Sequence, residues 1–99
     1  MKAKGRPKKT RLVRGDPKIA QFSPRGRPGR PDETELTIDE YEALRLADFK
    51  GLEQESACKY MAISRQTFGR ILKAARKKLA DGVVNGKIIK FAGGMVKIG

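Results

Sequence analysis

Residues 52–72 read LEQESACKYMAISRQTFGRIL, and this stretch has the pattern of two short helices joined by a tight turn. In its first half, Ala57, Cys58 and Met61 recur at a helical spacing and are expected to face a core. Ser64 follows the turn, and a serine hydroxyl can accept a bond from a free backbone N–H at the start of a helix. The stretch therefore predicts a helix, a turn and a second helix in immediate succession.

The second helix of this pattern has two contrasting faces. Its apolar residues recur at a helical spacing and form one stripe, which is expected to be buried: Phe68, Ile71, Leu72, Ala75 and Leu79. The opposite face is polar and cationic. In a helix-turn-helix, the N-terminal residues of the second helix reach base edges in the major groove of DNA. The sequence thus predicts a recognition helix at about residues 65–82.

Candidate contacts follow from their positions on that helix. Arginine suits bidentate contact with guanine and glutamine suits adenine, so base reading is assigned to the first turns. The base-reading candidates are Arg65, Gln66, Thr67, Gly69 and Arg70. The candidates for phosphate contact are Ser64, Lys73, Arg76 and Lys77. Gly69 lowers the stability of a helix by about 1 kcal/mol relative to alanine. It is therefore either merely tolerated or allows close approach of DNA or another helix. The alternative interpretation is a solvated cationic face on an ordinary core helix.

Charge is unevenly distributed along the chain. The 99 residues include 23 Lys+Arg and 11 Asp+Glu, for a formal net charge of +12. Residues 1–30 hold 11 basic and 1 acidic residue, residues 31–63 hold 3 and 9, and residues 64–99 hold 9 and 1. Such an excess favours a polyanionic partner, and the segregation indicates a surface with one side turned toward phosphates.

An earlier helix is predicted at about residues 38–49. Thr37 followed by Glu40 forms a capping box at its start, and Gly51 is the expected stop at its end. Its apolar stripe comprises Ile38, Tyr41, Leu44 and Leu52. The helix of the opening stretch is then predicted at about residues 53–61.

Residues 1–32 form a basic, Gly/Pro-rich arm that is expected to be partly disordered. Within it, residues 11–14 could form a short strand, and Phe22 could hold the arm against the core. The Arg-Gly-Arg-Pro segment at residues 25–28 and its near copy at residues 4–9 resemble the AT-hook cores that enter the minor groove. Contact with phosphates is the alternative role of the arm candidates, which are Arg6, Lys8, Lys9, Arg25, Arg27 and Arg30.

The C-terminal end allows two interpretations. Asn85 and Gly86 either form a hairpin turn or end the third helix, and the second interpretation is preferred. Residues 87–91 would then form a strand, which could lie beside residues 11–14, and residues 93–99 would be a tail. The expected fold class is mainly α: a three-helix helix-turn-helix domain over residues 33–92, with a basic N-terminal arm and room for short terminal β-strands.

The composition argues against several other functions. The chain has one cysteine, Cys58, and no histidine, so an intrachain disulfide and a Cys/His metal cluster are excluded. The carboxylates show no metal-ligand spacing and no nucleophile–base set, so neither enzymatic activity nor a cofactor is expected. No apolar run approaches the roughly 20 residues of a spanning helix, and no secretory signal is evident. We therefore expect a cytoplasmic protein without membrane contact.

Residues 36–87 resemble a small family of prokaryotic proteins that are predicted to bind DNA, with a helix-turn-helix similar to region 4 of bacterial sigma factors. The strings EALRLAD at residues 42–48 and SRQTFGRIL at residues 64–72 carry the resemblance, which extends over about residues 6–94. It implies a cytoplasmic, regulatory DNA-binding protein and no particular operator or ligand. The chain departs from the family pattern at three positions: Cys58 replaces an alanine, Ala62 replaces the turn glycine and Gly82 replaces an alanine. A wider turn and a shorter third helix are therefore expected.

The leading hypothesis is a DNA-binding transcriptional regulator whose partner is double-stranded DNA. A homodimer would suit a bipartite site, although no dimerisation helix is evident in the sequence. One alternative is a protein that binds structured RNA. Another is an adaptor whose acidic first-helix face docks RNA polymerase or another protein, with DNA contact secondary.

Overall fold

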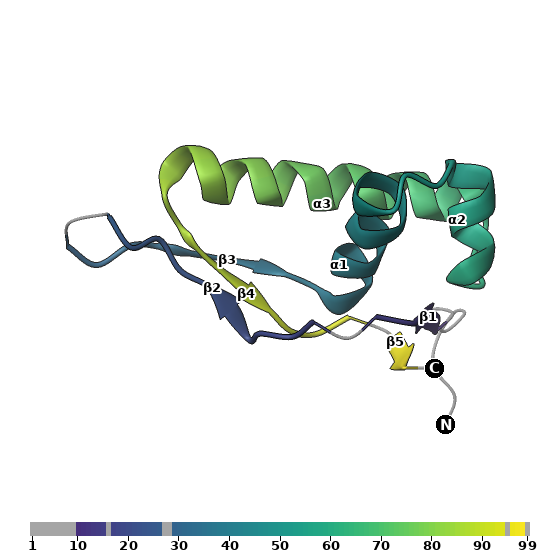
Figure 1. The fold of residues 1–99 in the computed structure, drawn as a ribbon, viewed down its shortest axis with the longest axis horizontal. Coiled ribbons are helices and arrows are strands. Elements are labelled where there is room, and N and C mark those ends of the chain that lie inside the picture. The colour runs from purple at the N-terminus through teal and green to yellow at the C-terminus, as the bar shows by residue number, and fades with distance from the viewer. Residues whose placement is uncertain (1–9, 16, 27–28, 95, 99) are drawn as a thin grey trace, which may run out of the picture.

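The computed structural model describes residues 10–15, 17–26, 29–94 and 96–98 (Figure 1). Within these residues the helical elements are α1 (Ile38–Leu44), a π-helical segment η1 (Arg45–Phe49), α2 (Gln54–Tyr60) and α3 (Arg65–Asn85). Helix α3 has 21 residues and runs along one side of the molecule, with α1 and α2 beside its N-terminal half (Figure 1). Three helices with a small sheet confirm the mainly α class in outline.

The strands form two small sheets among the described residues. They are β1 (Arg11–Val13), β2 (Gln21–Phe22), β3 (Glu33–Leu36), β4 (Ile88–Phe91) and β5 (Val96–Ile98). In the three-stranded sheet, β4 lies in the centre, antiparallel to β2 and parallel to β3. This sheet lies along the C-terminal half of α3, while β1 and β5 form a parallel pair (Figure 1).

These pairings correct three expectations. Residues 11–13 form a strand as predicted, but their partner is β5, which lies in the segment predicted to be a tail. The strand after α3 is also confirmed, but it pairs with β2 and β3 rather than with residues 11–14. Two segments of the predicted arm, β1 and β2, thus belong to sheets. Short strands pair with partners distant in the chain, which local periodicity does not reveal.

The first helix begins and ends where the sequence predicts. The Thr37 backbone N–H donates to the Glu40 carboxylate at 2.9 Å, and the Glu40 N–H donates to the Thr37 hydroxyl at 3.4 Å, which completes the capping box. The π-helical turn of η1 was not predicted, and in it the Lys50 N–H donates to the Arg45 carbonyl at 2.8 Å. Gly51 then adopts φ 77°, a left-handed conformation that glycine enters without strain and that ends the helix.

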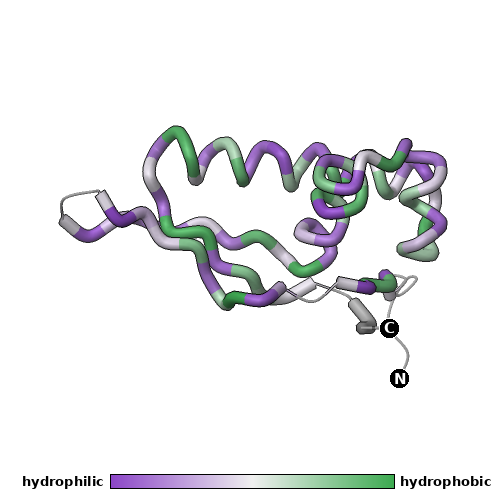
Figure 2. Tube along the Cα trace, in the orientation of Figure 1, coloured by the Kyte–Doolittle hydropathy of each residue, from purple (hydrophilic) through white to green (hydrophobic). Residues whose placement is uncertain are grey.

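The core consists of two clusters of buried side chains. One joins α1, η1, α2 and α3 through Ala43, Leu46, Ala57, Cys58, Met61, Phe68 and Leu72. The other joins β3, α3 and β4 through Leu36, Ala75 and Ile89. Hydrophilic and hydrophobic positions alternate along α3 in step with its turns (Figure 2). This alternation confirms most of the predicted stripe, because only its last member, Leu79, is exposed.

Two aromatic residues depart from the sequence expectations. Phe22 is 61% exposed, so it does not hold the N-terminal segment against the core. That segment is instead held by the backbone pairing of β2 with β4. Phe49 lies within the segment predicted as the first helix, near its apolar stripe. In the structure its side chain is 84% exposed at the end of η1.

Helix α3 ends at Asn85 and Gly86, as the preferred interpretation of the sequence predicted, and the expectation that Gly82 shortens it is wrong. The helix continues through this residue to Asn85 and ends at Gly86, which has φ 63°. A Cβ atom on Gly82 would lie 2.7 Å from side-chain carbons of Ile89. The glycine therefore does not shorten the helix but lets strand β4 approach it closely.

The carboxylates of α1 are buried, and each faces a cation of the same chain. Glu42 is fully buried and accepts hydrogen bonds from the backbone N–H of Arg14 at 2.9 Å and of Gly15 at 3.4 Å. The Arg45 guanidinium donates to the same carboxylate through Nε at 2.8 Å and Nη2 at 2.9 Å. One carboxylate thus ties the end of β1 to helix α1 and segment η1.

The two neighbouring carboxylates connect α1 with other elements. Lys78 of α3 donates to Glu40 at 2.9 Å, and Asp39 lies 3.8 Å from Arg11 of β1. Both acidic residues are buried. The three buried acidic side chains of α1 therefore face cations of the same chain, so the first helix does not present the acidic docking face that the adaptor hypothesis requires.

We predict that Glu42→Gln lowers the free energy of unfolding by about 3 kcal/mol, because a neutral amide would leave a buried cation and backbone donors poorly paired. Urea denaturation followed by circular dichroism measures the change. Glu35→Gln, at an exposed position of β3, is the matched control and should change stability by less than about 0.5 kcal/mol. Equal effects of the two substitutions would contradict the role assigned to Glu42.

Candidate nucleic-acid interface

The turn between α2 and α3 is closed by backbone hydrogen bonds. The Ile63 N–H donates to the Cys58 carbonyl at 3.1 Å, and the Ala62 N–H donates to the Lys59 carbonyl at 3.1 Å. These two bonds define a Schellman motif, in which the residue after the helix cap is usually glycine. Ala62 occupies that position with φ 56°. The expectation of a wider turn is therefore wrong: alanine accepts the left-handed conformation, which is strained for a residue with a Cβ atom.

Helix α3 begins at the predicted cap. The Thr67 backbone N–H donates to the Ser64 hydroxyl at 3.1 Å, and that hydroxyl donates to the Thr67 hydroxyl at 3.0 Å. The partly buried Ile63 packs against the core next to this cap. The cap and the turn together fix where the first residues of α3 lie.

Five of the predicted contact residues share the exposed side of α3. Arg65, Gln66, Arg70, Lys73 and Lys77 are all exposed. At 100° per residue, the last four fall within an arc of about 60° opposite the buried stripe, whereas Arg65 lies beside the edge of that stripe at the start of the helix. None of the four cations forms an ion pair with another described residue, so their charge faces solvent.

Two base-reading candidates lie elsewhere. Thr67 is half-buried, and its hydroxyl bonds to the cap serine. Gly69 is also half-buried, and a Cβ atom there would lie 3.4 Å from the Gln54 side-chain oxygen of α2. This is an ordinary van der Waals distance to the flexible end of a side chain, so the packing of α2 does not by itself require a glycine at this position.

Two phosphate candidates are already engaged within the chain. The Ser64 hydroxyl belongs to the helix cap. Arg76 forms a bidentate pair with Asp48 of η1, with donor–acceptor distances of 3.0 and 2.7 Å. A phosphate would have to compete with that carboxylate for Arg76. The pairing partner was not foreseen, because the two residues are 28 positions apart and no local pattern links them.

The Asp48–Arg76 pair changes the acidity of its carboxyl group. The hydrogen bond from Arg76 lowers the pKa of Asp48 below 3.8, with a smaller opposing effect from burial. The same bond raises the pKa of Arg76. The pair therefore stays fully charged at neutral pH and connects η1 to α3.

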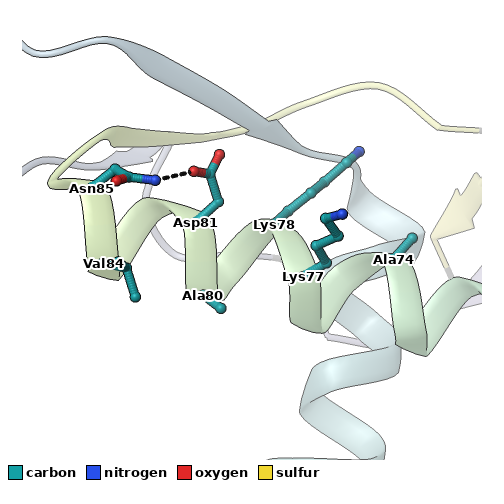
Figure 3. A pocket seen from close by; sticks show the side chains of 7 residues that line it. All are labelled: Ala74, Lys77, Lys78, Ala80, Asp81, Val84 and Asn85. Carbon is teal, nitrogen blue, oxygen red and sulfur yellow. Dashed lines mark hydrogen bonds between the residues drawn. The ribbon is translucent and has the colours of Figure 1, made fainter.

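The cationic surface of α3 ends after Lys77 and Lys78. Beyond Lys77 and Lys78 the outer side of the helix carries Ala80 and Val84, which line a shallow hollow (Figure 3). The Asn85 amide donates to Asp81 at 2.6 Å at the far end of this hollow (Figure 3). The candidate interface therefore spans the part of α3 from Arg65 to Lys77.

Two candidates of the N-terminal arm are separated from this interface. Arg25 and Arg30 are exposed in the connection between β2 and β3, which lies at the end of the molecule beyond the C-terminus of α3 (Figure 1). With a rise of about 1.5 Å per residue, the helix itself spans about 30 Å. Arg6, Lys8, Lys9 and Arg27 lie outside the described residues.

Three features of the described part of the chain concern other kinds of site. No group of three or more His, Cys, Asp or Glu residues is placed to hold a metal ion there. Among the same residues, no helix has the length and apolar character needed to cross a membrane. The free thiol of Cys58 is buried.

The sequence profile of the family described as "protein of unknown function DUF134" matches residues 1–99. The chain belongs to this family. A UPF0251 protein of Prosthecochloris aestuarii is 50% identical over 93 residues, which are 93% of this chain and 60% of that protein. A UPF0251 protein of Thermoanaerobacter pseudethanolicus is 48% identical over 94 residues, or 94% of this chain and 80% of that protein.

A third relative, a UPF0251 protein of Methanococcus maripaludis, is 49% identical over 96 residues, which are 96% of this chain and 74% of that protein. The chain thus spans less than two thirds of the Prosthecochloris protein and more of the other two. No solved structure matches the chain. The comparisons establish the family but assign it no activity.

We predict that the carboxyl group of Asp48 titrates below pH 3.8 and that Arg76→Gln moves its midpoint back toward this value. Because folding depresses this pKa, the contribution of the pair to stability is present above the unfolded pKa and is lost as the pH falls through the folded one. Carboxyl-carbon NMR measures the midpoint, and Lys90→Gln is the control that should leave it unchanged. An unshifted midpoint in the wild-type protein would contradict the pairing.

Proposed function

We propose that this chain binds double-stranded DNA through α3 and acts as a transcriptional regulator. The observation that carries the proposal is the set of exposed cations from Arg65 to Lys77 of α3 that form no ion pair with described residues, in a chain whose α1 carboxylates are buried against other cations. Uncompensated positive charge on one helix face attracts the phosphates of a nucleic acid.

The arrangement of α2, the turn and α3 supports a helix-turn-helix mode of binding. The short α2 shares a buried cluster with α3, and the capped N-terminus of α3 follows the turn directly. In such proteins the second helix enters the major groove with its N-terminal residues on base edges. We assign base reading to Arg65, Gln66 and Arg70, and phosphate contact to Lys73 and Lys77.

The rival functions receive less support. An adaptor would need an acidic face on α1, whose carboxylates are buried. A protein that binds single-stranded loops of RNA would need clustered aromatic platforms for stacking. The exposed aromatic residues Phe22, Phe49 and Tyr60 lie on β2, η1 and α2, which are three different elements.

The proposal is tested by titrating the protein with duplex DNA and with a hairpin RNA of equal length at two salt concentrations, followed by fluorescence anisotropy. We expect tighter binding to the duplex and an affinity that falls steeply with salt, with a log–log slope of about −0.9 for each phosphate neutralised. Equal or tighter binding to the RNA would favour the RNA-binding alternative. Binding to neither polymer would refute both.

We predict that Arg65→Ala and Lys77→Ala have different consequences. The loss of a bidentate base contact should cost about 1–3 kcal/mol on the preferred duplex and relax the preference at one base pair. The loss of a phosphate contact should weaken all duplexes alike and reduce the salt slope by about one phosphate. Selection from a random duplex pool followed by affinity measurements on single-site variants distinguishes the two. A uniform loss for Arg65→Ala would remove it from the base-reading set.

A further inference from the structure

A hollow of about 450 Å³ lies between the end of β1, segment η1 and helix α2. It shares no residue with the exposed face of α3. Its lining combines three cations with apolar and aromatic side chains: Arg14, Arg45, Leu46, Lys50, Leu52 and Tyr60. The volume falls within the range of about 300–1,000 Å³ that is usual for small-molecule sites.

Glu42 holds the Arg45 side chain and the backbone at Arg14, while Tyr60 positions the Arg14 side chain. Glu42 accepts two hydrogen bonds from the Arg45 side chain and one from the backbone N–H of Arg14. The Arg14 guanidinium lies over the Tyr60 ring at 5.8 Å, and its Nε donates to the Tyr60 carbonyl at 3.5 Å. The bond to Glu42 raises the pKa of Arg45 and positions its guanidinium group before any ligand arrives.

The charge of the hollow is only partly compensated. Lys50 forms no ion pair with another described residue, and Glu42 offsets only one of the three cations. An excess of two positive charges is left beside the hollow. A phosphate monoester carries about −1.5 to −2 at neutral pH, and arginine forks match its oxygen atoms. The site therefore complements a phosphate dianion in charge. The Arg14 guanidinium and the Lys50 ammonium would supply the donors, because Glu42 already occupies Nε and Nη2 of Arg45.

The rest of the lining suits an organic group attached to that phosphate. Leu46 is buried at the base of the hollow, Leu52 is half-buried and the Tyr60 ring is 46% exposed. We propose that this hollow binds a small phosphomonoester with a compact apolar or aromatic part, such as a nucleoside monophosphate. A concave site with an apolar base favours a small ligand over the DNA backbone, which typically meets protruding side chains.

The location of the site connects it with the turn before α3. The Leu12 N–H of β1 donates to the Met61 carbonyl at 3.0 Å, directly before Ala62. A ligand held by Arg14 and Lys50 would bridge β1 and η1 and would restrict the motion of β1 against the turn. We therefore expect the ligand to change the affinity for duplex DNA. This second part rests on the proposed function, whereas ligand binding does not.

The test uses the full chain without DNA and three probes: adenosine monophosphate, inorganic phosphate and uncharged adenosine. Isothermal titration calorimetry gives the affinities, and amide chemical-shift mapping locates the site. We expect the monophosphate to bind most tightly and to perturb residues of the hollow. Arg14→Gln and Lys50→Gln should each weaken it about tenfold, as the loss of a charged hydrogen bond implies. Lys18→Gln, at an exposed position outside the hollow, is the matched control and should have no effect.

Several outcomes would overturn the proposal. These are no binding of the monophosphate at 10 mM, shifts confined to α3, or full affinity in both hollow variants while circular dichroism shows them folded. Equal affinity for inorganic phosphate would contradict the role given to the apolar base. If duplex DNA displaces the monophosphate and perturbs the same residues, the hollow belongs to the DNA interface instead. If the monophosphate binds the hollow and the same protein has no affinity for duplex DNA, the site is supported and only the proposed function is refuted.

Discussion

The buried carboxylate of Glu42 is the interaction on which the positions of the neighbouring elements depend. It joins the end of β1, helix α1 and segment η1 at one point, through two backbone donors and one guanidinium group. In a chain with a net charge of +12, an internal anion also relieves repulsion between cations that folding brings together. Asp39 and Glu40 act similarly toward β1 and α3. The buried carboxylates of α1 thus act mainly inside the fold. Arg65, Arg70, Lys73 and Lys77 of α3 are left without an ion pair among the described residues.

The helices were predictable because their signals are local. The capping box at Thr37, the cap at Ser64, the stop at Gly51 and the end of α3 at Gly86 all depend on residues a few positions apart. The buried stripe of α3 was likewise correct except at its last member. Periodicity and capping reflect the backbone geometry of a single helix, so the sequence of one segment is sufficient to recognise them.

The sheets, the π-helical turn and the ion pairs could not be predicted in the same way. Strand β4 pairs with segments more than fifty residues earlier, and the pair of Asp48 with Arg76 spans 28 positions. The adaptor hypothesis placed the acidic residues of the first helix on an exposed face, whereas the fold buries Asp39, Glu40 and Glu42. Of the candidate contacts, the exposed residues of α3 follow from helix geometry. The separation of Arg25 and Arg30 from them follows only from the sheet topology (Figure 1).

Helix α3 is fixed at both ends by contacts that tolerate no change in its length. The Ser64 cap and the turn set its start, and the close packing of Gly82 on Ile89 sets the rotation of its C-terminal half against the sheet. One residue more or fewer between these points would rotate one half of the helix by about 100° relative to the other. The cations would then turn toward the core, or the apolar stripe toward water. Between Ser64 and Gly82, relatives of this chain should therefore vary by exchange of side chains and not by insertion or deletion.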